Sequence, residues 1–179
     1  MSDVLILTKE EPLNLTKNEP LATKLQVGAG WDFKNGVNID LDLIAHTNTK
    51  AIAYFGGKDP LNGSIVSGPD NRSGKGQGID EFVEVDLTKV PADVNKITFA
   101  LSSFSGESME QVQNEFVQIK DVASGRIIAK TTEPTLSDEQ GKKTLIFGSL
   151  VRSNNEWSFE TELVYNTKTA QEHLVSIRS

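Results

Sequence analysis

The stretch NIDLDLIA, residues 38–45, alternates polar and apolar side chains with a period of two. This is the period of a β-strand, whose successive side chains point to opposite faces. One face carries Ile39, Leu41 and Leu43, and the other carries Asn38, Asp40 and Asp42. The stretch therefore predicts a strand on which the two aspartates point the same way, about 6.6 Å apart.

The same period recurs along most of the chain. It is found in FVEVDL (82–87), KITFALSS (96–103), EFVQIKD (115–121), TLIFGSLVR (144–152) and EWSFETELVY (156–165), with turn residues such as SGR, EQGKK and SNN between segments. Two N-terminal pieces that end in proline, LTKEEP (7–12) and LTKNEP (15–20), add short extended segments. Many short strands separated by polar turns predict an all-β fold, a β-sandwich of two mainly antiparallel sheets.

Helical patterns are confined to two short stretches. SGESMEQVQN (105–114) predicts a turn or two, and TAQEHLVSI (169–177) predicts a C-terminal helix capped by Thr167 or Thr169. No low-complexity linker and no break in composition divides the chain. We therefore predict one domain over residues 1–179, with one or two short helices.

The composition narrows the classes of partner. The 179 residues include 18 Lys and Arg against 25 Asp and Glu, a net charge of −7, which argues against nucleic acid and favours small cations. There is no cysteine, which excludes disulfides, cysteine–zinc sites and thiol nucleophiles.

No apolar run approaches the roughly 18 residues of a membrane span, and nothing resembles a signal peptide. We expect a cytoplasmic protein with no membrane span.

The most unusual segment is PDNRSGKGQGIDE, residues 69–81, which is rich in glycine, acids and amides. It is not a phosphate-binding P-loop, because another glycine follows Gly74-Lys75 where that motif has Ser or Thr. It is not an EF-hand either. Asp70 and Glu81 have the spacing of that loop's first and last ligands, but Lys75 occupies the position that requires glycine.

An oxygen-rich cation site of another kind remains open. Calcium takes about six to eight oxygen ligands, and glycine-rich backbone can add carbonyl oxygens to carboxylates. The side chains that could contribute are Asp70, Asn71, Asp80 and Glu81 from the loop, Asp40 and Asp42 from the strand, and Asp32 after Gly30-Trp31. Two carboxylates roughly 5 Å apart repel by about 3 kcal/mol at an effective dielectric constant near 20, a cost that a divalent ion removes. The residues leave a second interpretation equally open: a solvated loop whose acids lie apart or are neutralised by Arg72 and Lys75.

Five segments, in order along nearly the whole chain, are similar to one known family. They are GAGWD (28–32), IDLDLIA (39–45), GPDNRSGKGQGIDE (68–81), VEVDLTKVPADVNKITF (83–99) and FGSLVRSNNEWSFE (147–160). Together they resemble the TerD family of bacterial tellurite-resistance and stress-response proteins. The resemblance implies a β-sandwich that binds calcium, with one or two ions.

Carried over residue by residue, the resemblance also implies a set of metal ligands. The side chains are Asp32, Asp40, Asp42, Asp70, Asn71, Asp80 and Glu81, and backbone carbonyls near Ser73, Lys75 and Gln77 are further candidates. The chain departs from the family pattern at Asn38, Pro69, Lys75, Gln77 and Ile79, mostly where relatives carry acids. Because calcium affinity rises with ligand charge, we hypothesise weaker binding, or loss of one of two sites.

Other conspicuous residues are predicted to carry no site. His46 and His173 are far apart in sequence and lack neighbouring acids at metal-ligand spacing. The aromatic residues predicted to pack in or near the core are Trp31, Trp157, Phe99, Phe116, Phe147 and Phe159. The serines predicted to mark a loop, with no nucleophile elbow among them, are Ser102, Ser103, Ser105 and Ser108.

From these features we expect a non-enzymatic stress-response protein. Calcium would neutralise the acids, order residues 69–81 and present a surface to partners, among which related stress proteins are expected. One alternative is a β-sandwich module that binds a small ligand or a carbohydrate, with any metal purely structural. Another is a metal-dependent hydrolase, which requires an ion with open coordination positions beside a base.

Overall fold

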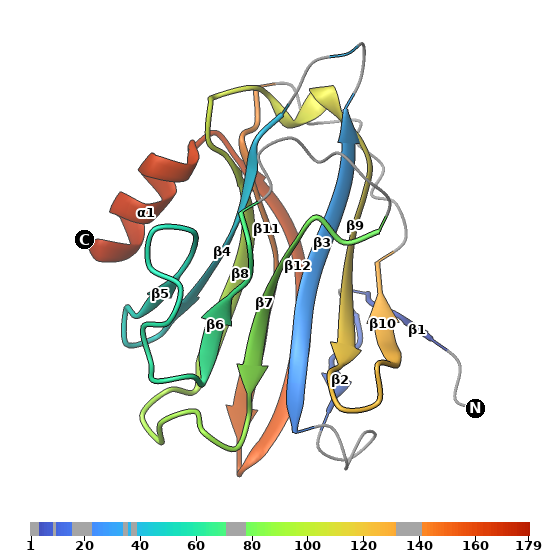
Figure 1. Ribbon diagram of the computed structural model, residues 1–179, viewed down its shortest axis with the longest axis vertical. Helices are drawn as coiled ribbons and strands as arrows, with labels where there is room; N and C mark the ends of the chain where they lie inside the picture. Colours follow the sequence, from blue (N-terminus) through green and yellow to red (C-terminus); the bar gives the residue numbers. More distant parts are fainter. Residues whose placement is uncertain are drawn as a thin grey trace.

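The computed structural model describes residues 4–8, 10–15, 23–33, 36, 39–70, 78–131 and 141–179, which form two packed sheets (Figure 1). Sheet A contains, in spatial order, β1 (Leu5–Ile6), β10 (Ile127–Lys130), β9 (Val112–Asp121), β3 (Lys24–Phe33), β7 (Glu81–Asp86) and β6 (Ile65–Ser67). Sheet B contains β2 (Leu13–Asn14), β12 (Glu156–Asn166), β11 (Thr144–Ser153), β8 (Lys96–Ser103), β4 (Leu41–Thr47) and β5 (Ile52–Ala53). Among the described strands, all pairs are antiparallel except β1 with β10. The predicted β-sandwich is confirmed.

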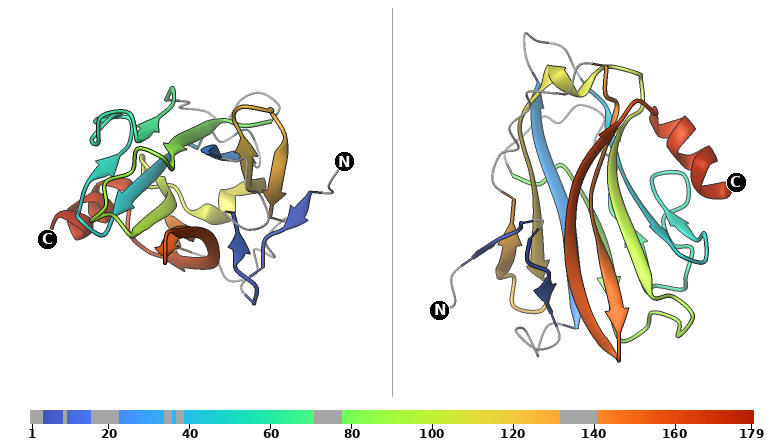
Figure 2. Two further views of the ribbon diagram at one scale, coloured as in Figure 1. Left: turned by 90° about the horizontal axis from the view of Figure 1, so that it is seen from below. Right: turned by 180° about the vertical axis from the view of Figure 1, so that it is seen from behind.

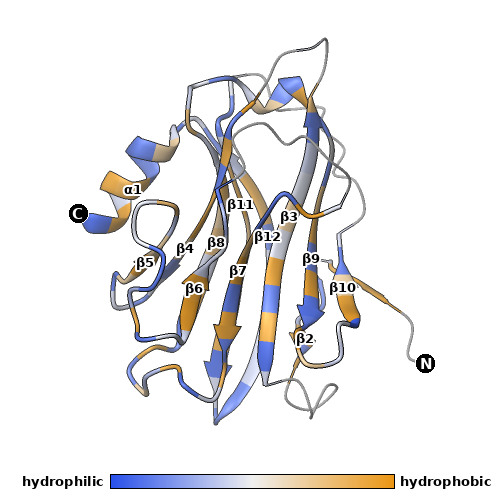
Figure 3. Ribbon diagram, in the orientation of Figure 1, coloured by the Kyte–Doolittle hydropathy of each residue, from blue (hydrophilic) through white to orange (hydrophobic). Residues whose placement is uncertain are grey.

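Alternation along the strands builds the core between the two sheets. In β7, Val83 and Val85 are fully buried, whereas Phe82, Glu84 and Asp86 face outward and stay partly exposed. Figure 3 shows this alternation as bands of high and low hydropathy along the strand. Each strand therefore contributes one face of side chains to the core, as its period of two requires.

The predicted aromatic core is confirmed for five of its six residues. Those at most 4% exposed are Trp31, Trp157, Phe99, Phe147 and Phe159. The prediction is wrong for Phe116, which is partly exposed on the outer face of sheet A. Its neighbours Glu115 and Val117 take the inward positions of β9. The alternation of the strand, and not the hydrophobicity of one side chain, decides which face a residue occupies.

The two predicted helical stretches have different outcomes. Residues 105–114 contain only one turn of 3-10 helix, η1 (Met109–Gln111). The C-terminal helix α1 (Ala170–Arg178) is confirmed, and its N-cap is Thr169, not Thr167. It lies against the outer face of sheet B (Figure 2). Among the described residues, no helix is long and apolar enough to cross a membrane.

The four serines predicted to mark a loop are divided between two environments. Ser102 and Ser103 end β8 and are fully buried, so the loop prediction is wrong for both. The hydroxyls of Ser102 and Thr144 lie 2.7 Å apart in a buried hydrogen bond between β8 and β11. Ser105 and Ser108 lie outside the strands, as predicted, and Ser108 caps η1. Ser102 and Ser103 are therefore structural residues of sheet B.

Candidate metal site

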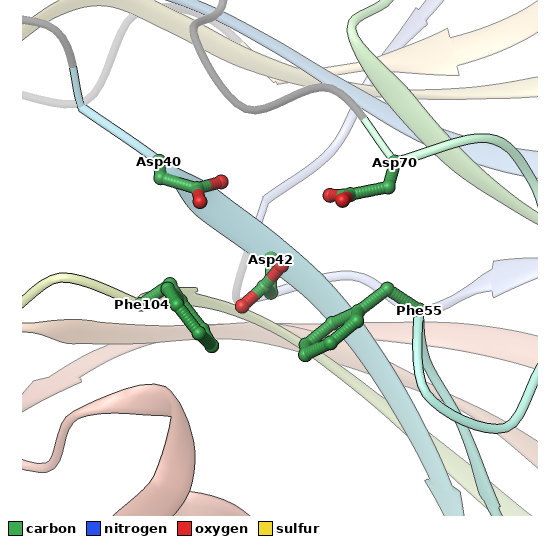
Figure 4. Close-up of a pocket in the computed structure, with 5 residues that line it drawn as sticks. All are labelled: Asp40, Asp42, Phe55, Asp70 and Phe104. Atoms are coloured by element: carbon green, nitrogen blue, oxygen red, sulfur yellow. The ribbon is translucent and has the colours of Figure 1, made fainter.

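Three of the predicted ligands meet at one place in the structure. Single carboxylate oxygens of Asp40, Asp42 and Asp70 all lie within 4.8 Å of one another. Asp42 is the second residue of β4, Asp40 immediately precedes that strand, and Asp70 follows β6 at the edge of sheet A. Figure 4 shows the three carboxylates converging. The strand period supplies two acids from sheet B, and the packing of the sheets adds the third.

The three aspartates line a pocket of about 260 Å³ together with Phe55 and Phe104. Phe55 lies in the turn after β5. Phe104 follows β8, and its N–H donates to the carbonyl of Asp40 at 2.9 Å. The two rings pack edge to face with centroids 5.6 Å apart. The pocket therefore has an acidic wall and an aromatic wall (Figure 4).

Sequence reasoning missed the aromatic wall. Phe55 stands outside any periodic segment, and Phe104 follows the last residue of its strand. The pairing of β4 with β8, in which Leu41 faces Ser103, brings Phe104, the residue after β8, beside Asp40. That pairing becomes visible only in the folded chain.

The glycine-rich loop is fastened at its C-terminal end to both sheets. Oε2 of Glu81 accepts the N–H of Leu43 at 2.7 Å, which joins β7 of sheet A to β4 of sheet B. Oδ2 of Asp80 accepts the N–H of Trp31 at 2.8 Å. The N–H of Asp80 donates to the carbonyl of Ala29 at 2.9 Å. The end of the loop is therefore held next to β3 and β4.

Asp80 and Asp32 form a second acidic pair, which does not belong to the cluster of Asp40, Asp42 and Asp70. Burial raises the pKa of Asp80 above its ordinary value, the hydrogen bond from Trp31 N–H lowers it, and the charge of Asp32 raises it again. Asp32 itself is exposed on β3. A raised pKa together with a hydrogen bond to β3 is consistent with a positioning role for Asp80.

The predicted ligands are thus distributed among three places. Asp40, Asp42 and Asp70 line the pocket, Glu81 contacts the residue that follows Asp42, and Asp32 and Asp80 lie along β3. Four further predicted ligands lie outside the described residues: Asn71, Ser73, Lys75 and Gln77. Their contribution to a site stays a prediction.

The glycines of GAGWD leave room for the returning loop. A Cβ added to Gly30 would clash with the carbonyl oxygen of Gly78 and come 2.5 Å from the ring of Phe116. A Cβ on Gly28 would meet the side chain of Ile79 at 3.1 Å. The separations at Gly30 are shorter than those between Cβ atoms and other heavy atoms in proteins. Glycine is therefore required at this position of β3, where the chain at Gly78 passes closely over it.

The donor set of the pocket fits a hard divalent cation. Its three side chains are carboxylates, the ligands that calcium and magnesium prefer. At a separation of about 5 Å, each pair of charges repels by roughly 3 kcal/mol at an effective dielectric constant near 20. Asp42 is only 2% exposed, so water and salt screen its charge poorly. A calcium ion held by these three residues would remove that repulsion.

Comparison with known proteins identifies relatives of the chain. Residues 4–163 match the family described as TerD domain. The chain is 31% identical over 170 residues to the tellurium resistance protein TerZ of Serratia marcescens, and 32% identical over 168 residues to general stress protein 16U of Bacillus subtilis. Each alignment covers 86% of both chains. The crystal structure of a homologue of the telluride resistance protein TerD from Streptomyces coelicolor matches this chain with a TM-score of 0.69 and 16% identity. The match covers 86% of this chain and 95% of that chain. The two chains therefore share a fold.

Proposed function

The chain belongs to the TerD domain family of stress and tellurium-resistance proteins, and from this premise we propose that it binds calcium through Asp40, Asp42 and Asp70. In this proposal the protein is a non-enzymatic part of a cytoplasmic stress response. Calcium supplies the positive charge that balances the acidic wall. The adjoining loop, residues 69–81, then forms a surface for partner proteins, among which related stress proteins are expected.

One observation supports the proposal more than any other. Three carboxylate oxygens carried by two different sheets converge within 4.8 Å at one pocket. Convergence of this kind costs free energy through charge repulsion, and a bound divalent cation offsets that cost. Aspartates without a binding role are expected at separate exposed positions, as Asp59 and Asp93 are in this protein.

The neighbouring residues fix the positions of these ligands. Asp42 is paired with Ser102 in the register of β4 with β8, which fixes its place along the sheet. The hydrogen bond from Leu43 N–H to Glu81 holds β4 against the end of the acidic loop. Glu81 and Asp80 are therefore assigned as positioning residues, which keep the two halves of the site together.

The aromatic wall favours a second candidate function. Phe104 is 43% exposed, and Phe55 beside it is partly exposed. Exposed rings next to carboxylates suit a small ligand or a carbohydrate that offers an apolar face and a cationic or hydroxyl group. In that case the protein is a β-sandwich binding module, and any metal is purely structural.

Calorimetric titration of calcium into chelator-treated protein tests the first candidate. We expect saturable binding of one or two ions per chain. Asp42→Asn and Asp70→Asn should each weaken the affinity by about tenfold or more, because each removes one negative ligand. The matched control is Asp93→Asn, an exposed residue whose carbonyl contacts Asn48 beyond the opposite end of β4, and it should bind like the parent. If millimolar calcium produces neither a heat of binding nor a shift in Tm, the proposed calcium-binding function is wrong.

A further inference from the structure

Helix α1 is held to the sandwich by a small hydrophobic cluster. Ala170 and Leu174 pack on Ile44 of β4, with Ile52 and Tyr54 beside them. An isolated helix of nine residues is marginal in water, so α1 depends on this packing to remain helical. Because α1 follows all of the described strands along the chain, its release would leave the order of those strands intact.

Two histidines meet at the inner side of this contact. His173 of α1 is 4% exposed, and its ring lies edge-on to that of His46 of β4, with centroids 6.0 Å apart. Within the described part of the chain, the buried atoms Nε2 of His173 and Nδ1 of His46 have no hydrogen-bond partner. The sequence separates these residues widely and gives no hint that they are neighbours. Their environment accommodates two neutral rings and offers no acceptor to the additional proton of a charged ring.

The charges around the pair also oppose protonation. The positive charge of Lys96, at the start of β8, lowers the pKa of His46. The positive charge of Lys168, just before α1, lowers the pKa of His173. Other charged groups near this contact are Glu172, which caps α1 and lies within the field of Lys143, Arg178, which donates to Tyr54, and Lys50, which donates to the carbonyl of Ser179. Burial lowers the pKa of both histidines, and that of His173 falls to about 4 with further lowering by His46 and Lys168.

We propose that α1 is a pH-released clasp: protonation of the histidine pair, buried His173 and partly buried His46, detaches the helix from sheet B while the sandwich stays folded. A charged ring at this position has to reach water, and detachment of α1 exposes both rings at once. Other contacts of the described residues oppose the release. At the C-terminal end they are the hydrogen bonds of Arg178 to Tyr54, at 3.1 Å, and of Lys50 to Ser179, at 2.7 Å.

The clasp is connected to the pocket through aromatic contacts. Tyr54 packs against the small cluster under α1, and Arg178 lies over its ring, 5.7 Å from the centroid. The ring of Tyr54 contacts Phe55 edge to face at 5.3 Å, and Phe55 contacts Phe104 in the same way at 5.6 Å. Detachment of α1 therefore removes the support behind the aromatic wall. Acid would therefore loosen that wall.

Hydrogen exchange followed by mass spectrometry tests the clasp on the full chain. Exchange is compared at pH 7 and pH 5 after correction for the intrinsic rate. With a pKa of 6.5 in the detached helix and about 4 in the docked one, opening of residues 170–178 should be about 20-fold greater at pH 5 than at pH 7. Peptides from β11 should not change. Equal loss of protection in α1 and β11, or no pH effect in α1, would overturn the proposal.

Two variants assign the effect to the histidine pair. His173→Leu keeps an apolar side chain in place but cannot be protonated, so α1 should stay protected at pH 5. Leu174→Ala weakens the packing alone, so it should increase the opening of α1 by the same factor at both pH values and leave the pH dependence unchanged. If His173→Leu follows the pH dependence of the parent, the clasp is not controlled by this pair. Titration of the His173 ring by NMR in the unaltered protein gives an independent answer, since an ordinary pKa near 6.5 would contradict the proposal.

Discussion

The side chain of Glu81 accepts the backbone N–H of Leu43 at 2.7 Å and thereby ties the end of the acidic loop to the strand that carries Asp42. Both residues are at most 6% exposed, so water cannot replace the bond without a rearrangement. The sequence pattern places Glu81 among the metal ligands, whereas the structure shows one of its oxygens already bonded to the backbone. The structural role of Glu81 is therefore to connect the two sheets beside the pocket.

Removal of this acceptor should destabilise the fold. Glu81→Ala leaves the buried N–H of Leu43 without an acceptor, and we expect a loss of about 1–3 kcal/mol in the free energy of unfolding. Glu81→Gln keeps an oxygen acceptor and should lose less. Urea unfolding followed by tryptophan fluorescence measures both. Glu84→Ala, on the outward face of the same strand in a partly exposed ion pair with Lys24, is the control and should change stability by less than about 1 kcal/mol.

Calcium should stabilise the protein if the acidic wall binds it. At a free calcium concentration one hundred times the dissociation constant, the expected gain is about 2.7 kcal/mol, or roughly 5–10 °C in Tm. In Asp42→Asn, at the same free calcium concentration, the gain should fall to about 1.4 kcal/mol or less, because a tenfold weaker affinity halves it. In the presence of chelator the same variant should melt no lower than the parent, because it relieves charge repulsion at a buried position. A calcium-dependent shift that is undiminished in Asp42→Asn would place the ion elsewhere.

The two walls of the pocket should contribute differently to calcium affinity. Phe104→Ala removes an exposed ring and no oxygen donor, so calcium affinity should change by less than about threefold. Asp70→Asn should weaken it by about tenfold or more. Isothermal titration distinguishes these outcomes. A larger effect of Phe104→Ala than of Asp70→Asn would favour the small-ligand module over the calcium site.

Gly30 should tolerate no side chain. In Gly30→Ala the added Cβ would meet the carbonyl of Gly78 and the ring of Phe116, so backbone must move, at a cost of about 1–3 kcal/mol. Gly57→Ala is the matched control, because its Cβ would lie 3.4 Å from the ring of Tyr54, an ordinary contact. Chemical denaturation of the two variants, compared with the parent, tests the difference. Equal stabilities would show that the loop does not pass closely over β3.

Stability should decrease as the pH falls below 6.5. Burial, together with the charges of His46 and Lys168, holds the pKa of His173 at about 4 in the folded protein, whereas the unfolded chain titrates near 6.5. Between these values the unfolded state binds more protons, so the free energy of unfolding drops by up to about 1.4 kcal/mol per pH unit from this group. Urea unfolding of the parent and of His173→Leu at pH 7, 6 and 5 measures the difference. Identical slopes would show that His173 is not the titrating group.

Part of the candidate site follows from local sequence. Asp40 and Asp42 point the same way because successive residues of a strand alternate between faces, whatever the rest of the chain does. The same rule places Ile44 and His46 on that outer face, where α1 covers them. The sequence also predicted α1, since a capping threonine and a helical pattern lie within a few residues of each other.

The sequence by itself determined the two-sheet fold and the pairing of acids on β4, because both depend on a period that each segment carries within itself. Only the tertiary structure decided which distant residues join that pair. Asp70 reaches it because β6 ends at the edge of sheet A beside β4, while Phe55 and Phe104 close the pocket from two separate turns. The meeting of His46 with His173 likewise depends on where α1 packs. Such contacts join residues far apart in the chain, and their geometry is set by strand order and sheet packing, which no local period encodes.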